Sequence, residues 1–254
     1  MLKKAFLAIL VLGSLLGCGR QSEDISSLEF TSMGTVASVK VRGGNSKEVC
    51  NIVKGVFLEV ERLLNAHYAD SELRRLAKFS EKEILENCSP LVRPCYEKAF
   101  ELERETLGAF SPRWRGEGTL DLGAIAKGYA VDLATKKLKE AYPNGPDILV
   151  DLGGNLRVVS GEWTIGFHGS SDTLALKSNE AVATSGEYFR GKHIKDARTG
   201  GDIKNSIHSV SVIHPESAMT ADGLSTVMFI LGRQKGEEFI KNYYPLAQVI
   251  WITQ

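Results

Sequence analysis

The chain has 254 residues, of which 43% are hydrophobic and 24% are charged. This composition is typical of a globular domain and excludes a wholly disordered chain, a collagen-like fibre and a multi-span membrane protein. The 31 basic and 31 acidic side chains cancel, so the sequence lacks the basic surplus of a nucleic-acid-binding protein. We therefore expect one globular domain with no nucleic-acid partner.

The N-terminus has the pattern of an exported lipoprotein. Lys3 and Lys4 precede an apolar stretch over residues 5–16, which has the length of a secretory h-region and is shorter than the ~20 residues of a membrane-spanning helix. The stretch ends in Leu15-Leu16-Gly17-Cys18, which resembles the bacterial lipobox, where cleavage precedes a diacylated cysteine. An ordinary signal peptide with a chance cysteine is the alternative. We expect a signal peptide over residues 1–17, lipidation of Cys18, a polar tether over residues 18–27 and one domain over residues 28–254.

Three further cysteines, Cys50, Cys88 and Cys95, follow Cys18. An odd number in an oxidising compartment leaves at least one free thiol. Cys88 and Cys95 are close enough in sequence to close a small loop, and the sequence leaves their pairing open. The sequence contains no Cys-x-x-Cys pair, which argues against a thiol oxidoreductase or a zinc–thiolate site.

Hydrophobic periodicity predicts helices and strands without a regular βαβ rhythm, which favours an α+β fold. Residues 28–42 have the pattern of two strands joined by a turn, because apolar and polar residues alternate over residues 37–42. Asn45 followed by Glu48 predicts a capping box, and a 3.6-residue apolar stripe predicts a helix that extends to Leu64. Further helices are expected over residues 89–107, 123–141, 220–231 and 234–243, and further strands over residues 148–152, 156–160, 163–167, 181–185, 207–213 and 246–252.

Two glycine turns are the first candidates for chemistry. Thr31-Ser32-Met33-Gly34-Thr35 lies between two predicted strands, and Asp121-Leu122-Gly123-Ala124-Ile125-Ala126-Lys127 leads into a predicted helix. The free N–H groups and the positive dipole end at a helix start suit phosphate oxygens, and Lys127 adds a cation. A loop-to-helix junction with a solvated lysine is the structural alternative.

Two later segments carry a candidate base and a candidate metal site. His193 has Asp196 and Arg198 nearby, so it can act as a base near anionic groups; a charged surface hairpin is the alternative. Asp222, Ser225 and Thr226 have i, i+3 and i+4 spacing, which places their oxygens on one helix face. Such oxygens suit Mg²⁺, whereas capping of the same helix by Thr220 or Asp222 is the alternative.

Taken together, these segments resemble the ApbE family, the FAD:protein FMN transferases. The resemblance covers nearly all of residues 28–254. It implies a single ApbE-like (T-fold-like) domain of antiparallel sheets with packed helices. It also implies Mg²⁺-dependent transfer of FMN from FAD to a threonine or serine hydroxyl of a target flavoprotein, with release of AMP. An FAD pyrophosphatase that yields FMN and AMP, and a flavin-binding lipoprotein without turnover, are the alternatives. The other matching motifs are Tyr68-Ala69-Asp70-Ser71-Glu72-Leu73, Gly108-Ala109-Phe110, Asp151-Leu152-Gly153-Gly154-Asn155 and Ala183-Thr184-Ser185-Gly186.

The resemblance implies the roles of individual residues and a location. Members are typically exported, often as lipoproteins. We therefore expect a lipoprotein at the inner membrane, facing the periplasm, whose acceptor flavoprotein belongs to a membrane redox complex. His193 matches the histidine implicated in the transfer. The FAD contacts fall on Met33, Tyr68, Ala109, Phe110, Asp121, Lys127 and Lys195, and the Mg²⁺ ligands fall on the Ala124 carbonyl, Asp222, Ser225 and Thr226.

The chain departs from the family pattern at several positions. Ser111 follows Phe110 where members usually have aspartate, and only residues 111–119 separate Phe110 from the Leu120-Asp121 motif, where relatives commonly carry a much longer segment. Ala197 replaces a common proline, and Ser225 replaces a common aspartate. We expect the shortening to open one wall of the flavin site and Ser225 to weaken Mg²⁺ binding by removing a negative charge.

The N-terminal pattern predicts that Cys18→Ala yields a folded protein that is no longer attached to the membrane, because acyl chains rather than protein contacts supply the anchor. Fractionation of expressing cells measures this directly. A variant that stays wholly in the membrane pellet would contradict the lipoprotein assignment.

Overall fold

The computed structural model describes residues 24–167, 171–186, 191 and 193–253. The predicted signal peptide and Cys18 lie outside these residues. The strands are β1 (Ile25–Ser32), β2 (Thr35–Arg42), β3 (Asp147–Leu152), β4 (Asn155–Ser160), β5 (Glu162–Gly166), β6 (Thr173–Lys177), β7 (Ala181–Gly186), β8 (Ile207–His214) and β9 (Gln248–Thr253). The helices are α1 (Ser46–Leu64), α2 (Glu72–Leu76), α3 (Glu81–Asn87), α4 (Arg93–Glu105), α5 (Ala126–Ala141) and α6 (Ala218–Tyr243).

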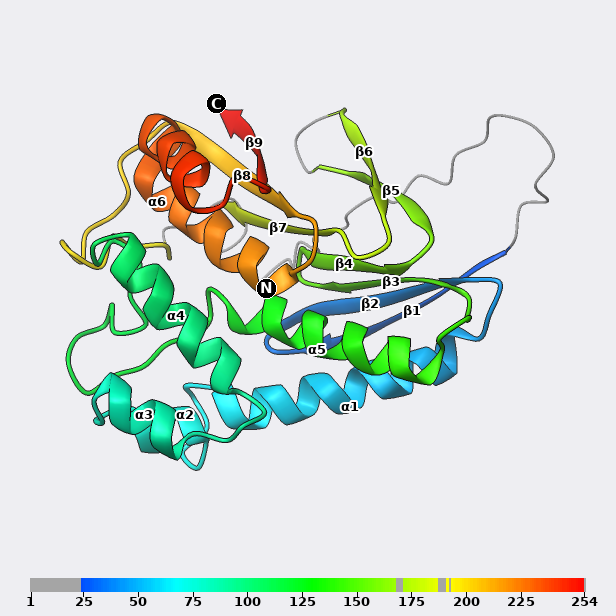
Figure 1. Ribbon diagram of the computed structural model, residues 1–254, viewed down its shortest axis with the longest axis horizontal. Helices are drawn as coiled ribbons and strands as arrows, with labels where there is room; N and C mark the ends of the chain where they lie inside the picture. The colour runs from blue at the N-terminus through cyan, green and yellow to red at the C-terminus, as the bar shows by residue number, and fades with distance from the viewer. Residues whose placement is uncertain (1–23, 168–170, 187–190, 192, 254) are drawn as a thin grey trace, which may run out of the picture.

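Seven of these strands form one sheet in the order β1-β2-β3-β4-β7-β8-β9, and β5 and β6 form a separate hairpin. All strand pairings are antiparallel, as Figure 1 shows. Helices α1, α5 and α6 pack against strands of the sheet, whereas α2, α3 and α4 lie together at one end (Figure 1). The predicted α+β fold, an antiparallel sheet with packed helices, is confirmed.

The large sheet carries an apolar layer on each face. Ala37, Val39 and Val41 of β2 are fully buried and alternate with partly exposed residues, as a period-two pattern requires. On β8, Val212 belongs to the main core with residues of α1, α5 and α6, whereas Ile213 belongs to a second core with residues of β5 and β6. The helices therefore cover one face and the hairpin covers part of the other.

Helices α5 and α6 approach closely at Gly128. A Cβ atom on Gly128 would lie 2.2 Å from the carbonyl oxygen of Ala218 and 2.8 Å from the Cβ of Asp222, so only glycine fits. This contact brings the first turns of two helices far apart in the sequence to the same place.

Several boundaries differ from the sequence predictions. β1 begins at Ile25, so residues 25–27 belong to the sheet and not to the predicted tether. Asn45 caps α1 by accepting from Lys47 N at 3.0 Å, but Glu48 contacts the Asn45 side chain rather than its backbone, so the predicted capping box is wrong. α4 begins at Arg93 and not at residue 89, because residues 89–92 form a separate turn. Helices α2 and α3 were not predicted, since five and seven residues are too few to show a helical period. Strand β6 was not predicted either.

Helix α6 is interrupted at Gly232, which has φ 75° and ψ 171°. The sequence predicts a break at this place.

Cys50, Cys88 and Cys95 are buried free thiols, so Cys88 and Cys95 do not form a disulfide. No helix in the described part of the chain is long and apolar enough to cross a membrane.

The close contact predicts opposite effects of the same substitution at two helical glycines. Gly128→Ala should lower the free energy of unfolding by about 1–3 kcal/mol, because the added methyl group overpacks the α5–α6 contact. Gly55 of α1 is exposed, and a methyl group added there would have nothing within 4 Å, so Gly55→Ala should raise it by about 0.4–1 kcal/mol. Denaturant unfolding measures both, and equal effects would contradict the contact.

Candidate functional site

Two carboxylates join the first turns of α5 and α6. Asp222 of α6 accepts the Gly128 N–H at 2.9 Å, and Asp132 of α5 accepts the N–H groups of Ala218 and Met219 at 2.7 and 3.0 Å. The first N–H groups of a helix have no partner within it, and the helix dipole favours negative charge there. The residue before α5 provides no side-chain cap. Each helix therefore receives a capping carboxylate from the other.

Asp222 also decides which backbone oxygen is available at the start of α5. In a regular helix the Gly128 N–H would bond to the carbonyl of Ala124, four residues earlier. Here it donates to Asp222, and α5 begins only at Ala126. The Ala124 carbonyl is thereby left without that helical donor. Asp222 thus contacts the first turn of α5, which follows Ala124, the residue whose carbonyl is another predicted Mg²⁺ ligand.

Lys127 extends this junction towards Asp121. Lys127 Nζ lies 2.7 Å from the carbonyl oxygen of Gly123 and 3.7 Å from Asp222 Oδ2. Asp121 Oδ1 accepts the Gly123 N–H at 2.9 Å. The predicted FAD contacts Asp121 and Lys127 are therefore brought together at Gly123, beside the predicted metal ligands.

Ser225 and Thr226 share a cluster of hydroxyl groups with Ser185 at the end of β7. Ser185 Oγ lies 2.8 Å from Ser225 Oγ and 3.2 Å from Thr226 Oγ1. Ser225 donates its only proton to the Asp222 carbonyl at 2.9 Å, so it accepts from Ser185, and Ser185 accepts from Thr226. Each hydroxyl has one proton and two lone pairs, so this direction leaves lone pairs on all three oxygens for a cation.

This donor set fits a hard divalent cation. It consists of one carboxylate, one backbone carbonyl and hydroxyl groups, all of them oxygen ligands of the kind that Mg²⁺ takes. Asp222 is 4% exposed and Ser225 is fully buried. No cluster of three His, Cys, Asp or Glu side chains suited to a metal occurs in the part of the chain that the structure describes. The charge offered to a cation here therefore comes from Asp222.

The predicted FAD contacts Met33 and Tyr68 meet at Glu61 of α1, which the sequence did not single out. Met33 N and Tyr68 OH donate to the Glu61 carboxylate at 3.0 and 3.3 Å. The negative charge of Glu61 raises the pKa of Tyr68. Met33 has φ 48°, a left-handed conformation in the turn between β1 and β2 that the Glu61 hydrogen bond supports. Glu61 therefore sets the positions of both residues.

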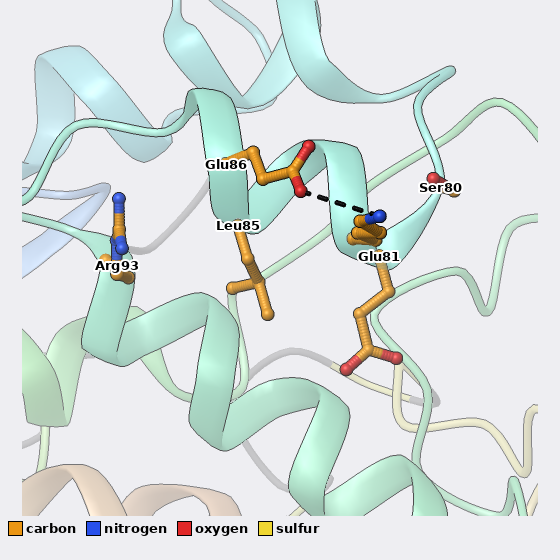
Figure 2. Close-up of a pocket in the computed structure, with 6 residues that line it drawn as sticks. Ser80, Glu81, Leu85, Glu86 and Arg93 are labelled. Carbon is orange, nitrogen blue, oxygen red and sulfur yellow. Dashed lines mark ion pairs between the residues drawn. The ribbon is translucent and has the colours of Figure 1, made fainter.

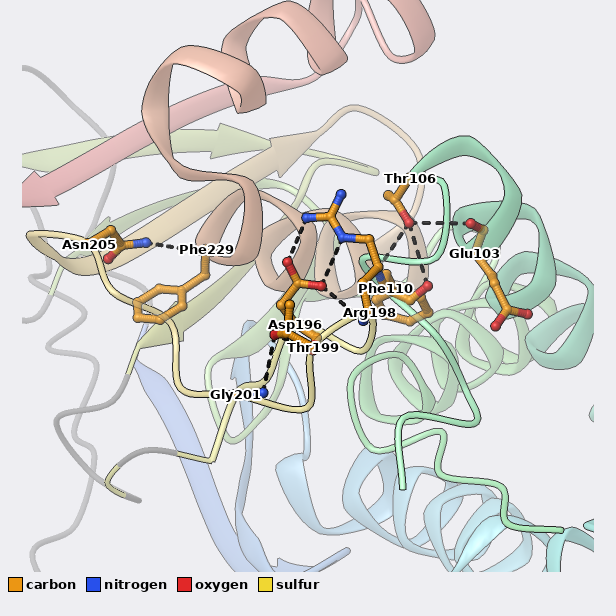
Figure 3. A network of polar contacts seen from close by, with 9 residues as sticks. All are labelled: Glu103, Thr106, Phe110, Asp196, Arg198, Thr199, Gly201, Asn205 and Phe229. Carbon is orange, nitrogen blue, oxygen red and sulfur yellow. Dashed lines mark hydrogen bonds and ion pairs between the residues drawn. The ribbon is translucent and has the colours of Figure 1, made fainter. Parts of the chain in front are cut away.

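Ala109 and Phe110 lie against the segment that follows His193. Thr106 Oγ1 accepts the Phe110 N–H at 3.0 Å, and the Ala109 carbonyl accepts the Ala197 N–H at 3.0 Å. Figure 3 shows Phe110 between Thr106 and Arg198. Both predicted FAD contacts are buried, at 1% and 5% exposure.

The charged side chains that follow His193 form ion pairs with one another. His193 is exposed, and its Nδ1 lies 2.8 Å from the Gly191 carbonyl. Lys195 forms an ion pair with Asp202. Asp196 accepts from Arg198 Nε at 2.9 Å, and this hydrogen bond lowers the pKa of Asp196 (Figure 3). Asp196 is thus committed to Arg198 and is a poor base, whereas His193 is accessible.

Two surface cavities lie away from all the predicted site residues. The larger, of about 620 Å³, lies beside α3 and the start of α4 and mixes acidic and basic side chains (Figure 2). The other, of about 480 Å³, lies between β6 and β9. Neither offers the oxygen cluster of the α5–α6 junction. Their linings are Ser80, Glu81, Lys82, Leu85, Glu86 and Arg93 for the first, and residues 167, 172–174 and 250–253 for the second.

Comparison with known sequences identifies the family. The model described as the ApbE family matches residues 113–251. The chain is 40% identical over 131 residues to the FAD:protein FMN transferase of Klebsiella pneumoniae (strain 342), which covers 46% of this chain and 40% of that protein. It is 34% identical over 139 residues to the FAD:protein FMN transferase of Haemophilus influenzae, which covers 47% and 39%. The chain thus spans about two fifths of the length of these curated relatives.

Solved structures share the fold over a larger part of the chain. The flavin transferase ApbE from Vibrio cholerae superposes with a TM-score of 0.72 at 22% identity, over 91% of this chain and 94% of that one. The ApbE protein of Thermotoga maritima gives a TM-score of 0.74 at 21% identity, over the same shares of both chains. The ApbE-like fold expected from the sequence is therefore confirmed.

Asp151, near the end of β3, gives the fold a pH dependence. Its Oδ1 accepts the Gly154 N–H at 2.8 Å. Burial raises the pKa of Asp151 to about 6, against the opposing effects of this hydrogen bond and of Lys40. The ordinary value is about 3.9, so the folded protein holds more protons than the unfolded chain between these two values. The stabilisation by this proton is complete below about pH 4 and is lost as the pH rises through about 6.

We predict that Asp151→Asn removes this component, because the amide keeps an acceptor for Gly154 and cannot ionise. Melting temperatures at pH 4 and pH 8 test it: the variant should lose less stability between them than the native protein. An unchanged difference would contradict the raised pKa.

The two variants Asp222→Ala and Asp222→Asn separate the capping role from the charge. The alanine variant leaves the Gly128 N–H without its acceptor and should cost about 1–3 kcal/mol of unfolding free energy. The asparagine variant keeps an acceptor and should cost less, while both should lose Mg²⁺ affinity. Urea unfolding and Mg²⁺ titration of the same preparations give both quantities, and normal Mg²⁺ affinity in the asparagine variant would contradict a ligand role.

Proposed function

The chain belongs to the ApbE family, and from this premise we propose that it transfers FMN from FAD to a threonine or serine hydroxyl of a target flavoprotein and releases AMP. The observation that carries the proposal is the α5–α6 junction, where Asp222 contacts Lys127 and the Gly128 N–H at the start of α5. The family match over residues 113–251 includes all of them. The two relatives described above, each named FAD:protein FMN transferase, support the same reaction.

The reaction exchanges one phosphorus–oxygen bond for another. The acceptor hydroxyl oxygen attacks the phosphorus of the FMN half of FAD, and the bond to the bridging oxygen breaks, so that AMP leaves with the electron pair. Negative charge grows on the phosphate oxygens. The Lys127 ammonium group favours such charge.

We propose that Mg²⁺ is held by Asp222, Ser225, Thr226 and the Ala124 carbonyl, and when bound it would neutralise phosphate charge and align the attack. Ser225, in place of the aspartate common in the family, leaves a single carboxylate in this set. The hydroxyl cluster with Ser185 keeps Ser225 and Thr226 in place. We therefore expect Mg²⁺ to bind more weakly than it would to two carboxylates.

His193 is our candidate for the base that takes the proton from the acceptor hydroxyl. A positioned general base contributes typically about 10²–10⁴-fold to such a step. The exposure of His193 suits an acceptor that is itself a protein. Asp196 is less suited, because Arg198 holds its pKa low.

Met33 and Tyr68 are our candidates for contact with the isoalloxazine ring. A thioether and an aromatic ring both pack well on a flat π surface, and Glu61 holds the two residues together. Ala109, Phe110, Asp121 and Lys195 complete the set of FAD contacts that we propose from the resemblance.

We propose that the protein works as a lipoprotein. The Leu15-Leu16-Gly17-Cys18 sequence supports diacylation of Cys18 and retention at the inner membrane, facing the periplasm. An acceptor flavoprotein in a membrane redox complex would then be within reach.

AMP release tests the function directly. The purified protein is incubated with FAD and Mg²⁺, with and without the protein acceptor of the Klebsiella pneumoniae relative as a probe. Release of AMP only with the acceptor is the expected result. Release at the same rate without acceptor would overturn transfer in favour of an FAD pyrophosphatase, and retention of intact FAD would indicate a flavin-binding protein without turnover.

The role of His193 predicts that His193→Ala slows single-turnover transfer by about 10²-fold or more, while FAD affinity stays close to that of the native protein. His67→Ala, a change at another histidine of the same chain, is the control. Unchanged single-turnover transfer in His193→Ala would remove this residue from the mechanism.

A further inference from the structure

The short loop over residues 111–120 brings two side chains to Asp121. Asp121 Oδ2 accepts from Trp114 Nε1 at 3.2 Å and from Arg115 Nε at 3.1 Å. The Arg115 guanidinium carbon lies 4.2 Å from the centre of the Trp114 ring, a favourable cation–π distance. Because Asp121 Oδ1 is bound to Gly123 N, Arg115 is held near the start of α5.

The loop itself is tied down by its backbone and by Arg113. The Asp121 N–H donates to the Pro112 carbonyl at 2.8 Å. Arg113 donates from its guanidinium group to the carbonyls of Ala77 and Thr119 at 2.7 and 3.3 Å. These contacts join both ends of the loop and attach it to the end of α2. The position of Arg115 is therefore set by the fold.

The end of the Arg115 side chain remains available to a ligand. The side chain is 56% exposed, and within the described residues only its Nε makes a hydrogen bond. The planar guanidinium group, with parallel N–H donors, matches the oxygens of a phosphate. Its neighbours Asp121 and Lys127 are already assigned to FAD.

We propose that Arg115, positioned by Trp114 and Asp121, binds the diphosphate of FAD; this inference rests on the proposed function. The segment after Phe110 is much shorter here than the family pattern leads one to expect. The loop nevertheless covers Asp121 with an aromatic ring and a cation. In this chain, Arg115 thus supplies positive charge for the diphosphate from a loop that the family resemblance does not assign to the site.

Binding of three flavins by the purified full chain tests the inference. Dissociation constants for FAD, FMN and riboflavin are measured with Mg²⁺ at fixed ionic strength, for the native protein and for Arg115→Gln. The variant should bind FAD at least about tenfold more weakly, the loss expected for a charged hydrogen bond, and should bind riboflavin as the native protein does. Arg233→Gln is the control. Arg233, like Arg115, is exposed and forms an ion pair through its Nε, in this case with Glu237.

Two further variants test the positioning role of Trp114. Trp114→Phe keeps a ring under the guanidinium group and should retain FAD affinity better than Trp114→Ala. Equal losses in these two variants would contradict the role of the ring.

The outcomes separate the inference from the proposed function. Native protein that binds FAD, together with an unchanged constant in Arg115→Gln, would overturn the inference and leave the function standing. An equal loss of riboflavin binding would also overturn it, since riboflavin has no phosphate. Native protein that does not bind FAD would overturn the proposed function and the inference together.

Discussion

The rest of the site depends on one constraint, the exchange of capping carboxylates: α5 and α6 each cap the other helix with an aspartate side chain. Asp222 caps α5, and Asp132 caps α6. Asp132 also pairs with Arg157 of β4 at 2.7 Å, which ties the helix pair to the sheet. The exchange requires the helices to touch, and the glycine at position 128 permits the contact. Without this arrangement, the Asp222 carboxylate would not contact the first turn of α5.

The same carboxylate therefore serves the fold and the proposed chemistry. The helix dipole and the Gly128 N–H stabilise the negative charge of Asp222, and Lys127 lies 3.7 Å from it. A carboxylate fixed in place by the fold is positioned to bind a cation without further reorganisation. Because the same carboxylate caps α5 and is the proposed metal ligand, we expect stability and metal affinity to change together, and only variants that keep the acceptor can separate them.

The long periodic elements were predictable because their signals are local. The apolar stripe of α1, the alternation of buried and partly exposed residues in β2 and the break of α6 at Gly232 are all set by residues within a few positions of one another. Helices α2 and α3, with five and seven residues, are too short to show a period. The prediction of a capping box at Asn45 is wrong, because the Glu48 side chain accepts from the side-chain amide of Asn45 instead of its backbone N–H.

The site was predictable only in part, because its organisation depends on contacts across the chain. The sequence offered capping of its own helix as the alternative role for Asp222. In the structure Ser217 caps α6, and Asp222 caps a helix that begins almost a hundred residues earlier. Glu61 carries no local signal, since a polar residue on a helix surface is common. Ser185 lies in a motif that the resemblance singles out, but the sequence gives no role for its side chain. Their roles follow from Met33, Tyr68, Ser225 and Thr226, which they hold.

The most direct test of the central claim is a crystal structure of the full chain with FAD and Mn²⁺, in which anomalous scattering locates the metal. Mn²⁺ takes oxygen ligands of the same kind as Mg²⁺. We expect one strong anomalous peak at the α5–α6 junction, in contact with Asp222, Ser225, Thr226 and the Ala124 carbonyl, with the FAD diphosphate beside it. A peak elsewhere, or FAD bound away from the start of α5, would contradict the account.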